Sequence, residues 1–150
     1  MVQNAPSTKC LKCGAKAVQP RQRPGRTMRY RNIGALPLPA DFPVPTCGRC
    51  AAEYLSPATC EHLAPLLLSS YQAALRSAAA KLVTAATANI SQRRLEAVLG
   101  ISQGYLSGIK SGKRQPSSAF VALLYLVAQP DAIPRLERFF AFLGGPENLG

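Results

Sequence analysis

Residues 91–116, SQRRLEAVLGISQGYLSGIKSGKRQP, decide the fold of the C-terminal half of this chain. The apolar residues fall into two groups at helical spacing, and each group is expected to bury one face of a short helix. The first group is Leu95, Val98 and Leu99, and the second is Leu106 and Ile109. Gly100 lies between them, where a positive φ angle turns one helix sharply onto the next. We expect Ser102 to be the N-cap of the second helix.

The composition indicates a globular protein with a polyanionic partner. The chain has 150 residues, and because 47% of them are hydrophobic it can bury a compact core. Its 18 Lys and Arg against 7 Asp and Glu give a net charge of +11. Such a charge favours nucleic acid first, and acidic protein surfaces or anionic lipid after it. With a single histidine, His62, and no paired carboxylates, the sequence argues against an enzyme.

The sequence also predicts a cytoplasmic protein without a membrane partner. The longest apolar run, at residues 119–128, is about half of the roughly 20 residues that a membrane helix needs. The N-terminus, MVQNAPSTKC, has no apolar secretory segment.

Four of the five cysteines form two C-x-x-C pairs, Cys10 with Cys13 and Cys47 with Cys50. Two thiolates on each tight turn can reach one tetrahedral ion, so the sequence predicts a four-sulfur Zn²⁺ site. The alternative is a set of reduced or redox-active cysteines without metal. Because four thiolates already complete the tetrahedron, we interpret the two remaining candidates as a packed cysteine and a capping or surface histidine. These are Cys60 and His62.

An arginine-rich segment separates the two cysteine pairs. Met28, Tyr30 and Ile33 alternate with polar residues, which predicts a short antiparallel strand paired with residues 15–19. The arginines are Arg21, Arg23, Arg26, Arg29 and Arg31. Two interpretations stay open for them, a solvated mobile loop and an arm that contacts phosphates.

The predicted fold class is mainly α, with a small N-terminal zinc-binding β module followed by an all-α five-helix domain. Residues 1–55 form the zinc module with its arginine-rich loop. Residues 56–88 are rich in alanine and leucine at helical spacing and predict a connecting first helix. Residues 89–150 hold the remaining helices. Because the last helix is unusually aromatic for a chain end, we expect part of it to be the face of a homodimer.

The motif at residues 92–116 resembles the helix-turn-helix of the lambda repressor and Cro type, the XRE family. The residues that carry the resemblance are Gln92, Leu95, Gly100, Ile101, Ser102, Tyr105, Leu106, Ser107, Ile109, Gly112 and Pro116. It covers about residues 75–136 and implies a DNA-binding fold that commonly reads paired half-sites as a dimer. The family usually has alanine one position after Leu95. This chain has Glu96 there, which we expect to lean out toward Arg93 or solvent.

In this docking mode the second helix enters the major groove of duplex DNA by its N-terminal turns. Its outward positions are the predicted base-reading residues Gln103, Gly104, Ser107 and Gly108. The predicted phosphate contacts surround the helix and are Gln92, Arg93, Arg94, Lys110, Lys113 and Arg114. For Gln103 and Ser107 the alternative is an ordinary solvated surface. Because no arginine lies in the second helix, we expect modest base specificity, supplemented by DNA shape and dimer spacing.

Two cysteine knuckles before such a motif resemble the MqsA family of antitoxins, which carry a YgiT-type zinc finger. The matching finger residues are Cys10, Cys13, Gly14, Tyr30, Cys47 and Cys50. The resemblance implies an autorepressor whose finger holds a cognate toxin. Two features differ, since residues 51–53 replace the Gly-Glu that usually follows the second knuckle, and the arginines would repel a basic toxin. We therefore expect a DNA-binding transcriptional repressor, while a stand-alone zinc-containing regulator and a general nucleic-acid-binding protein stay open.

Overall fold

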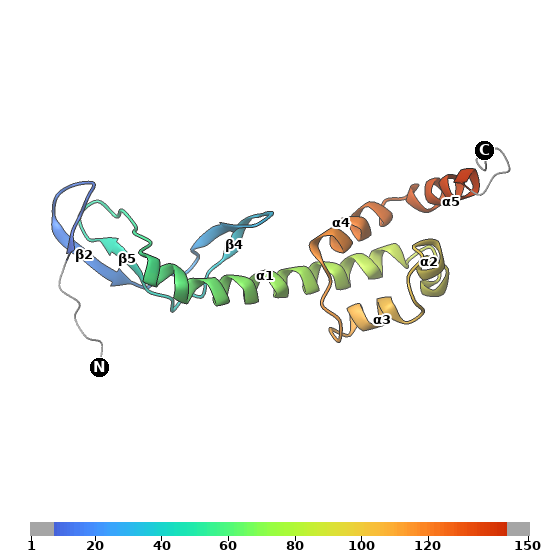
Figure 1. Cartoon of the computed structure of the whole chain (residues 1–150), viewed down its shortest axis with the longest axis horizontal. Coiled ribbons are helices and arrows are strands. Elements are labelled where there is room, and N and C mark those ends of the chain that lie inside the picture. Colours follow the sequence, from blue (N-terminus) through green and yellow to red (C-terminus); the bar gives the residue numbers. More distant parts are fainter. Residues whose placement is uncertain (1–7, 144–150) are drawn as a thin grey trace. The chain divides into compact units, whose positions relative to one another are not determined.

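The protein is described by a computed structural model over residues 8–143, and it is mainly α with a small N-terminal β module, as the sequence predicts (Figure 1). The strands are β1 (Thr8–Lys9), β2 (Lys16–Arg21), β3 (Thr27–Tyr30), β4 (Ile33–Pro37) and β5 (Val44–Cys47). The helices are α1 (Pro57–Ala86), α2 (Gln92–Val98), α3 (Tyr105–Lys110), α4 (Ser118–Val127) and α5 (Ala132–Leu143). Two compact units divide inside α1, between Tyr71 and Gln72. Helix α1 occupies nearly all of the predicted connecting segment, and its halves belong to different units.

The N-terminal unit holds two small antiparallel sheets. One has the strand order β1-β2-β5, and the other pairs β3 with β4. The predicted pairing of residues 15–19 with the strand near Tyr30 is therefore wrong. Arg31 has a φ angle of 52°, so the chain reverses within a two-residue turn and β3 pairs with the strand that follows it. Strand β2 pairs with β5 instead, and the register Val18↔Cys47 brings the second cysteine pair close to the first.

Helix α1 begins at a side-chain cap. The Ser56 hydroxyl accepts the backbone N–H of Thr59 at 3.1 Å, which satisfies one donor of the first turn. The first half of α1 then buries three residues in the N-terminal unit, namely Leu63, Leu67 and Tyr71. The Tyr71 hydroxyl donates to Oδ1 of Asn32 over 2.8 Å, so the β3–β4 turn is attached to the helix.

One apolar cluster forms the core of the C-terminal unit. Its buried members come from the second half of α1 and from helices α2, α3 and α4, and they are Ala79, Val83, Ala86, Leu95, Leu106, Ile109, Leu124 and Val127. Leu95, Leu106 and Ile109 are essentially inaccessible to solvent, so the predicted apolar face of α3 is confirmed in full and that of α2 in part. Val98 and Leu99 of the first face are only half-buried.

Helix α5 lies at the edge of this cluster. Ile133 and Leu136 pack against the core, yet α5 has no fully buried residue. Phe139 and Phe140 are 52% and 50% exposed. Helix α5 thus belongs to the core at its start and to the surface at its end. Among residues 8–143, no single helix is long and apolar enough to cross a membrane; α4 and α5 reach such a length only together, with a bend of 103° between them.

Candidate metal centre and nucleic-acid interface

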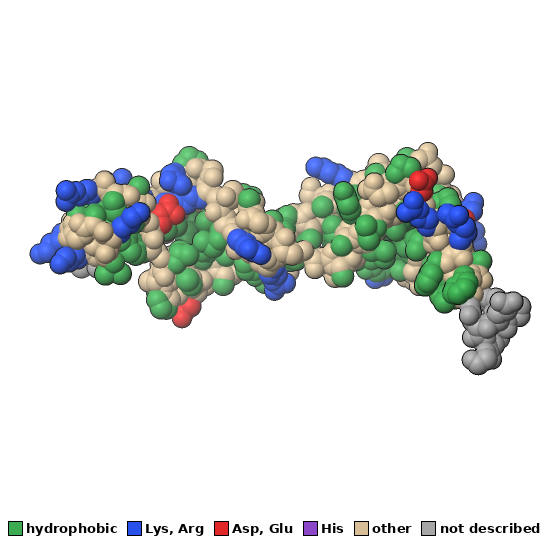
Figure 2. Space-filling view, turned by 90° about the horizontal axis from the view of Figure 1, so that it is seen from above, with side chains coloured by type: hydrophobic (Ala, Val, Ile, Leu, Met, Phe, Trp, Pro, Cys, Tyr) green, Lys and Arg blue, Asp and Glu red, His purple; other side chains and the backbone are tan. Residues whose placement is uncertain are grey.

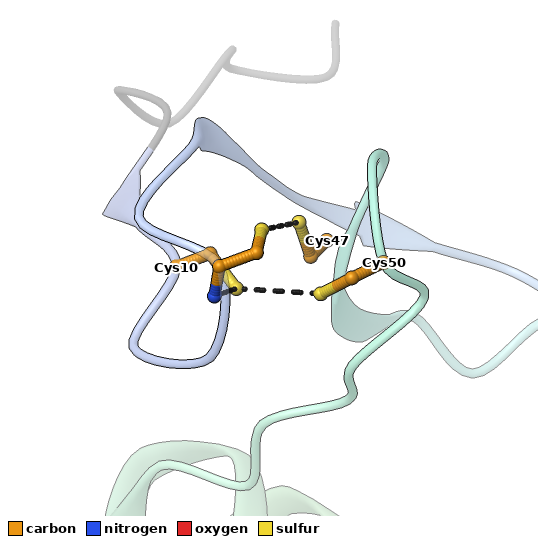
Figure 3. A group of neighbouring side chains, drawn as sticks. Cys10, Cys47 and Cys50 are labelled. Atoms are coloured by element: carbon orange, nitrogen blue, oxygen red, sulfur yellow. Dashed lines mark hydrogen bonds between the residues drawn. The ribbon is translucent and has the colours of Figure 1, made fainter.

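The four predicted cysteine ligands lie together in the N-terminal unit. The Sγ atoms of Cys10, Cys13, Cys47 and Cys50 all lie within 4.8 Å of one another. Cys10 and Cys50 are 3.6 Å apart at sulfur, and Cys13 and Cys47 are 3.7 Å apart (Figure 3). A tetrahedral ion with metal–sulfur distances of about 2.3 Å would hold its ligands about 3.8 Å apart, so the four thiols match the geometry of a metal site. The predicted cysteine cluster is confirmed.

Backbone groups orient the two knuckles. Gly14 has a φ angle of 72° and donates its N–H to the carbonyl of Cys10 over 2.8 Å, which closes the first turn. The N–H of Cys13 points at Sγ of Cys10, and the N–H of Arg49 at Sγ of Cys47, both at 3.4 Å. Such N–H groups stabilise sulfur as thiolate, the form that binds metal.

Tyr54 is a neighbour of the site that sequence reasoning missed. Its hydroxyl lies 3.0 Å from Sγ of Cys10, and this hydrogen bond lowers the pKa of the Cys10 thiol to about 6. A backbone hydrogen bond at Ala15 lowers the pKa of Cys13, but hydrogen bonds with the other cysteines and burial together outweigh it and raise this pKa to about 12. A bound cation would favour the ionised form of each thiol.

The other cysteine and the histidine stay outside this cluster. Cys60 and His62 are both exposed on the first turns of α1. The surface position of His62 is confirmed, whereas the prediction of a packed Cys60 is wrong. Cys60 shares a helix face with Leu63 and Leu67, but that face is buried only from Leu63 onward.

The arginines between the cysteine pairs have different surroundings from one another. Arg21 and Arg29 belong to exposed positions of β2 and β3, so much of the expected loop is strand. Arg26 is buried, and its guanidinium donates to Glu53 at 3.0 Å, to Thr46 at 3.2 Å and to a backbone carbonyl at 2.8 Å. This side chain stabilises the module from inside and cannot contact phosphates.

Helices α2 and α3 form the predicted pair with a tight turn. Ser91 caps α2 by accepting the N–H of Arg94, and Gly100 has the expected positive φ angle, 64°. The predicted cap of the second helix is wrong. Helix α3 starts at Tyr105, and its N-cap is Gly104, which has a φ angle of 83° and offers no side-chain hydrogen bond. Gln103 consequently lies in the turn just before the helix.

Glu96 supplies the hydrogen bonds that the glycine cap lacks. Glu96 is 2% exposed, and its carboxylate accepts the backbone N–H groups of Gly104 at 3.1 Å and Leu106 at 3.0 Å. The expectation that Glu96 leans out toward Arg93 or solvent is therefore wrong. Burial raises the pKa of this carboxyl, but the two backbone N–H groups and the amide of Gln92 more than compensate, so its pKa is lowered. The Glu96 carboxylate of α2 therefore takes the place of the side-chain cap that Gly104 cannot provide for α3.

Two side chains from outside α3 lie against its surface. Gln92 of α2 donates from Nε2 to Oγ of Ser107 over 2.8 Å. Arg114, which follows α3, places its Cζ atom 5.0 Å from the ring centroid of Tyr105. Of the other predicted phosphate contacts, Arg93, Lys110 and Lys113 are exposed. Arg94 forms an ion pair with Glu137 of α5, with 2.7 Å between nitrogen and oxygen.

Comparison with known proteins identifies the C-terminal motif. Residues 87–124 match the family model for a helix-turn-helix. The match covers 38 of the 150 residues, from just after α1 to within α4, and includes all of α2 and α3. A search of curated proteins and a search of solved structures each found no match. The C-terminal unit therefore carries a DNA-binding motif of the XRE type.

Proposed function

We propose that this protein is a sequence-specific transcriptional repressor that binds duplex DNA through α2 and α3. The observation that carries the proposal is the helix-turn-helix match on two helices whose outer surface is small, polar and basic. Glu96, the only acidic residue of α2, faces inward, so it does not repel a phosphate backbone. A repressor of this kind acts on the chromosome and hence in the cytoplasm.

The proposed reading surface is formed by the start and outer face of α3. Gln103 lies at the N-terminal end, where residues of such helices reach base edges, and its amide suits the N6 and N7 atoms of adenine. The hydroxyl of Ser107 accepts a hydrogen bond from Gln92, which leaves its own O–H free to donate to a base. Gly104 has no side chain and no atom close to its Cα, so the backbone at the start of α3 can lie close to the groove floor, whereas the Arg114 side chain lies over Gly108.

The proposed phosphate contacts are the exposed basic residues around the motif. Arg93, Lys110 and Lys113 are the primary candidates because they are exposed and none of them is in an ion pair or over an aromatic ring within residues 8–143. Arg94 would have to leave Glu137 to contribute. Each contact should add about 0.9 to the slope of log affinity against log salt. We expect Lys110→Gln and Lys113→Gln each to lower that slope by about this amount for every duplex, and an unchanged slope would contradict the assignment.

We further propose that α5 forms a homodimer interface. Phe139, Phe140 and Leu143 are each at least half exposed, and Figure 2 shows hydrophobic side chains gathered at the C-terminal end of the described chain. An amphipathic helix without a fully buried residue gains apolar burial by pairing with a second copy. A dimer would read two half-sites about one or more DNA turns apart.

For the cysteine cluster we propose Zn²⁺ as the bound ion. Four sulfur ligands at these separations are the donor set of structural zinc. Cys10, Cys13, Cys47 and Cys50 would hold it, and the ion would stabilise a module whose own apolar core is small. Metal analysis of purified protein tests this assignment.

An antitoxin role is the second candidate, and it rests on the family resemblance of the two modules. Lys and Arg side chains gather over the β module in Figure 2, and Lys9, Arg21 and Arg29 are exposed there. A toxin bound to this unit would need an acidic contact surface. A neighbour that co-purifies in equal amount would support the antitoxin role, and a protein that purifies alone would favour the stand-alone regulator.

Genome-wide binding by the full chain, followed by footprinting, is the decisive experiment. The proposal expects protection of a short inverted repeat, including one near the protein's own promoter. Equal affinity for the repeat, a scrambled duplex and RNA would instead identify a general nucleic-acid-binding protein.

A further inference from the structure

We infer that Arg114, which lies outside α3, is the residue through which this protein recognises guanine. The inference rests on the proposed function and deepens it. Arginine is the usual side chain for guanine, because its planar fork donates to O6 and N7 together. Helix α3 contains no arginine, and its only basic residue is Lys110 in the last turn.

Gly108 forms a notch in α3 that the Arg114 side chain fills. A Cβ atom on residue 108 would lie 3.0 Å from Cδ of Arg114, 3.1 Å from its Cγ and 3.2 Å from its Nε. The Arg114 stem therefore crosses directly over the Cα atom of Gly108. The backbone N–H of Arg114 also donates to the carbonyl of Gly108 over 3.0 Å. The main chain and the side chain of Arg114 are thus both held against α3.

The guanidinium of Arg114 is held over an aromatic ring. Its Cζ atom lies 5.0 Å from the ring centroid of Tyr105, one helical turn before Gly108. The Tyr105 ring is itself packed edge-to-face on Phe120, with 5.2 Å between centroids. A guanidinium lying over a ring keeps its N–H groups at its edge available to a ligand. Ordering the arginine before it binds reduces the entropy lost on binding.

The Arg114 guanidinium lies toward the outside of the helix pair. Leu106 and Ile109 are the fully buried residues of α3, while Ser107 is exposed and adjacent to Gly108. Arg114 is exposed, and no carboxylate within residues 8–143 is in ion-pair contact with it. The ordered guanidinium of Arg114, which has no ion-pair partner among the described residues, therefore lies beside the face of α3 that is proposed to enter the major groove. A guanine-reading arginine would have to lie there.

Two substitutions separate guanine recognition from simple attraction to phosphate. Arg114→Lys keeps the positive charge but removes the planar fork. Gly108→Ala keeps Arg114 intact and displaces its stem from the notch. Alanine is also a better helix former than glycine, and Gly108 has an ordinary helical φ angle, so this variant should fold. Lys113→Gln is the matched control, since it removes an exposed charge next to Arg114.

The test is a selection in which the full-length protein enriches its preferred sites from random duplexes. The slope of log affinity against log salt is then measured on the most enriched site. The wild type should prefer guanine at a fixed position in each half-site. Arg114→Lys and Gly108→Ala should each lower that preference by about 5- to 150-fold and leave the salt slope unchanged. Lys113→Gln should lower the slope by about 0.9 and keep the guanine preference.

Three outcomes would overturn the inference. If both variants keep the guanine preference, Arg114 does not read it. A third variant, Arg114→Gln, removes the charge. If it lowers the salt slope but keeps the guanine preference, Arg114 is a phosphate contact. A wild type that selects sites without guanine also excludes the role. A wild type that selects no sequence at all would overturn the proposed function itself, which is a different result from a wild-type preference that survives both substitutions.

Discussion

Replacing Glu96 with alanine, the residue usual in the XRE family, should destabilise the C-terminal unit by about 3 kcal/mol. The carboxylate accepts two backbone N–H groups, and hydrogen bonds to charged groups contribute about 1.5 to 3 kcal/mol each. The N–H of Leu106 is buried and would lose its partner, so this bond counts fully. Gly104 is exposed, and water can replace part of the second bond. For a domain of this size, about 3 kcal/mol lowers Tm by roughly 12 °C or more.

Calorimetry of the purified full chain measures this loss. Glu96→Gln should lie between the wild type and the alanine variant, because its amide oxygen retains one acceptor. The control is Glu137→Gln, which removes the exposed ion pair with Arg94 and should cost less than about 1 kcal/mol. If Glu96→Ala is no more destabilising than this control, the carboxylate does not cap α3.

The hydrogen bonds of the Glu96 carboxylate also predict how the stability of the protein depends on pH. The folded-state pKa of Glu96 is lowered from its ordinary value of 4.5, so the carboxylate contributes stability at pH values above 4.5. That contribution is lost as the pH falls through the lower, folded-state pKa. The wild type should therefore lose more stability than Glu96→Gln on acidification below about pH 5, and parallel losses would contradict the hydrogen-bonding scheme.

Three further predictions concern the metal and the dimer. Chelation should unfold the cysteine module but leave the core around Leu95 and Leu106 intact, as seen by NMR; a module that stays folded without zinc would refute the metal's structural role. Tyr54→Phe removes the hydroxyl at Cys10 and should weaken zinc binding about tenfold in competition with a chelator, whereas Tyr125→Phe, at an exposed tyrosine of α4, should not. Phe139→Ser with Phe140→Ser should convert the proposed dimer to a monomer, as measured by light scattering at micromolar concentration, and a monomeric wild type would exclude this interface.

Local patterns in the sequence were sufficient for the helix pair and the cysteine cluster. The spacing of Leu95, Leu106 and Ile109 depends only on helical periodicity, and Gly100 on the need for a positive φ angle. The C-x-x-C spacing similarly depends on the reach of two thiolates on one turn. In each case the residues that form the pattern lie within a few positions of one another in the sequence.

The features that were missed depend on contacts between distant residues. Serine is a common N-cap residue, so Ser102 is the natural choice from the sequence. The N-cap is instead Gly104, whose backbone N–H is bound by the distant Glu96 carboxylate. Strand β2 pairs with the distant strand β5, which brings the cysteine pairs together, and the local alternation near Tyr30 does not reveal this pairing. Arg26 resembles its solvated neighbours in sequence and is buried through partners up to 27 residues away.

The Glu96 carboxylate also limits how α3 can move relative to α2. Helix α3 has six residues, too few to be stable in isolation, and its first turn is completed by hydrogen bonds from α2. Gln92 adds a hydrogen bond from α2 to the outer face of α3. In the proposed complex the two helices would therefore approach a duplex as one rigid unit, and twisting or bending of the DNA would have to correct an imperfect fit. Operator sequences should then differ in affinity even at base pairs that no side chain reaches.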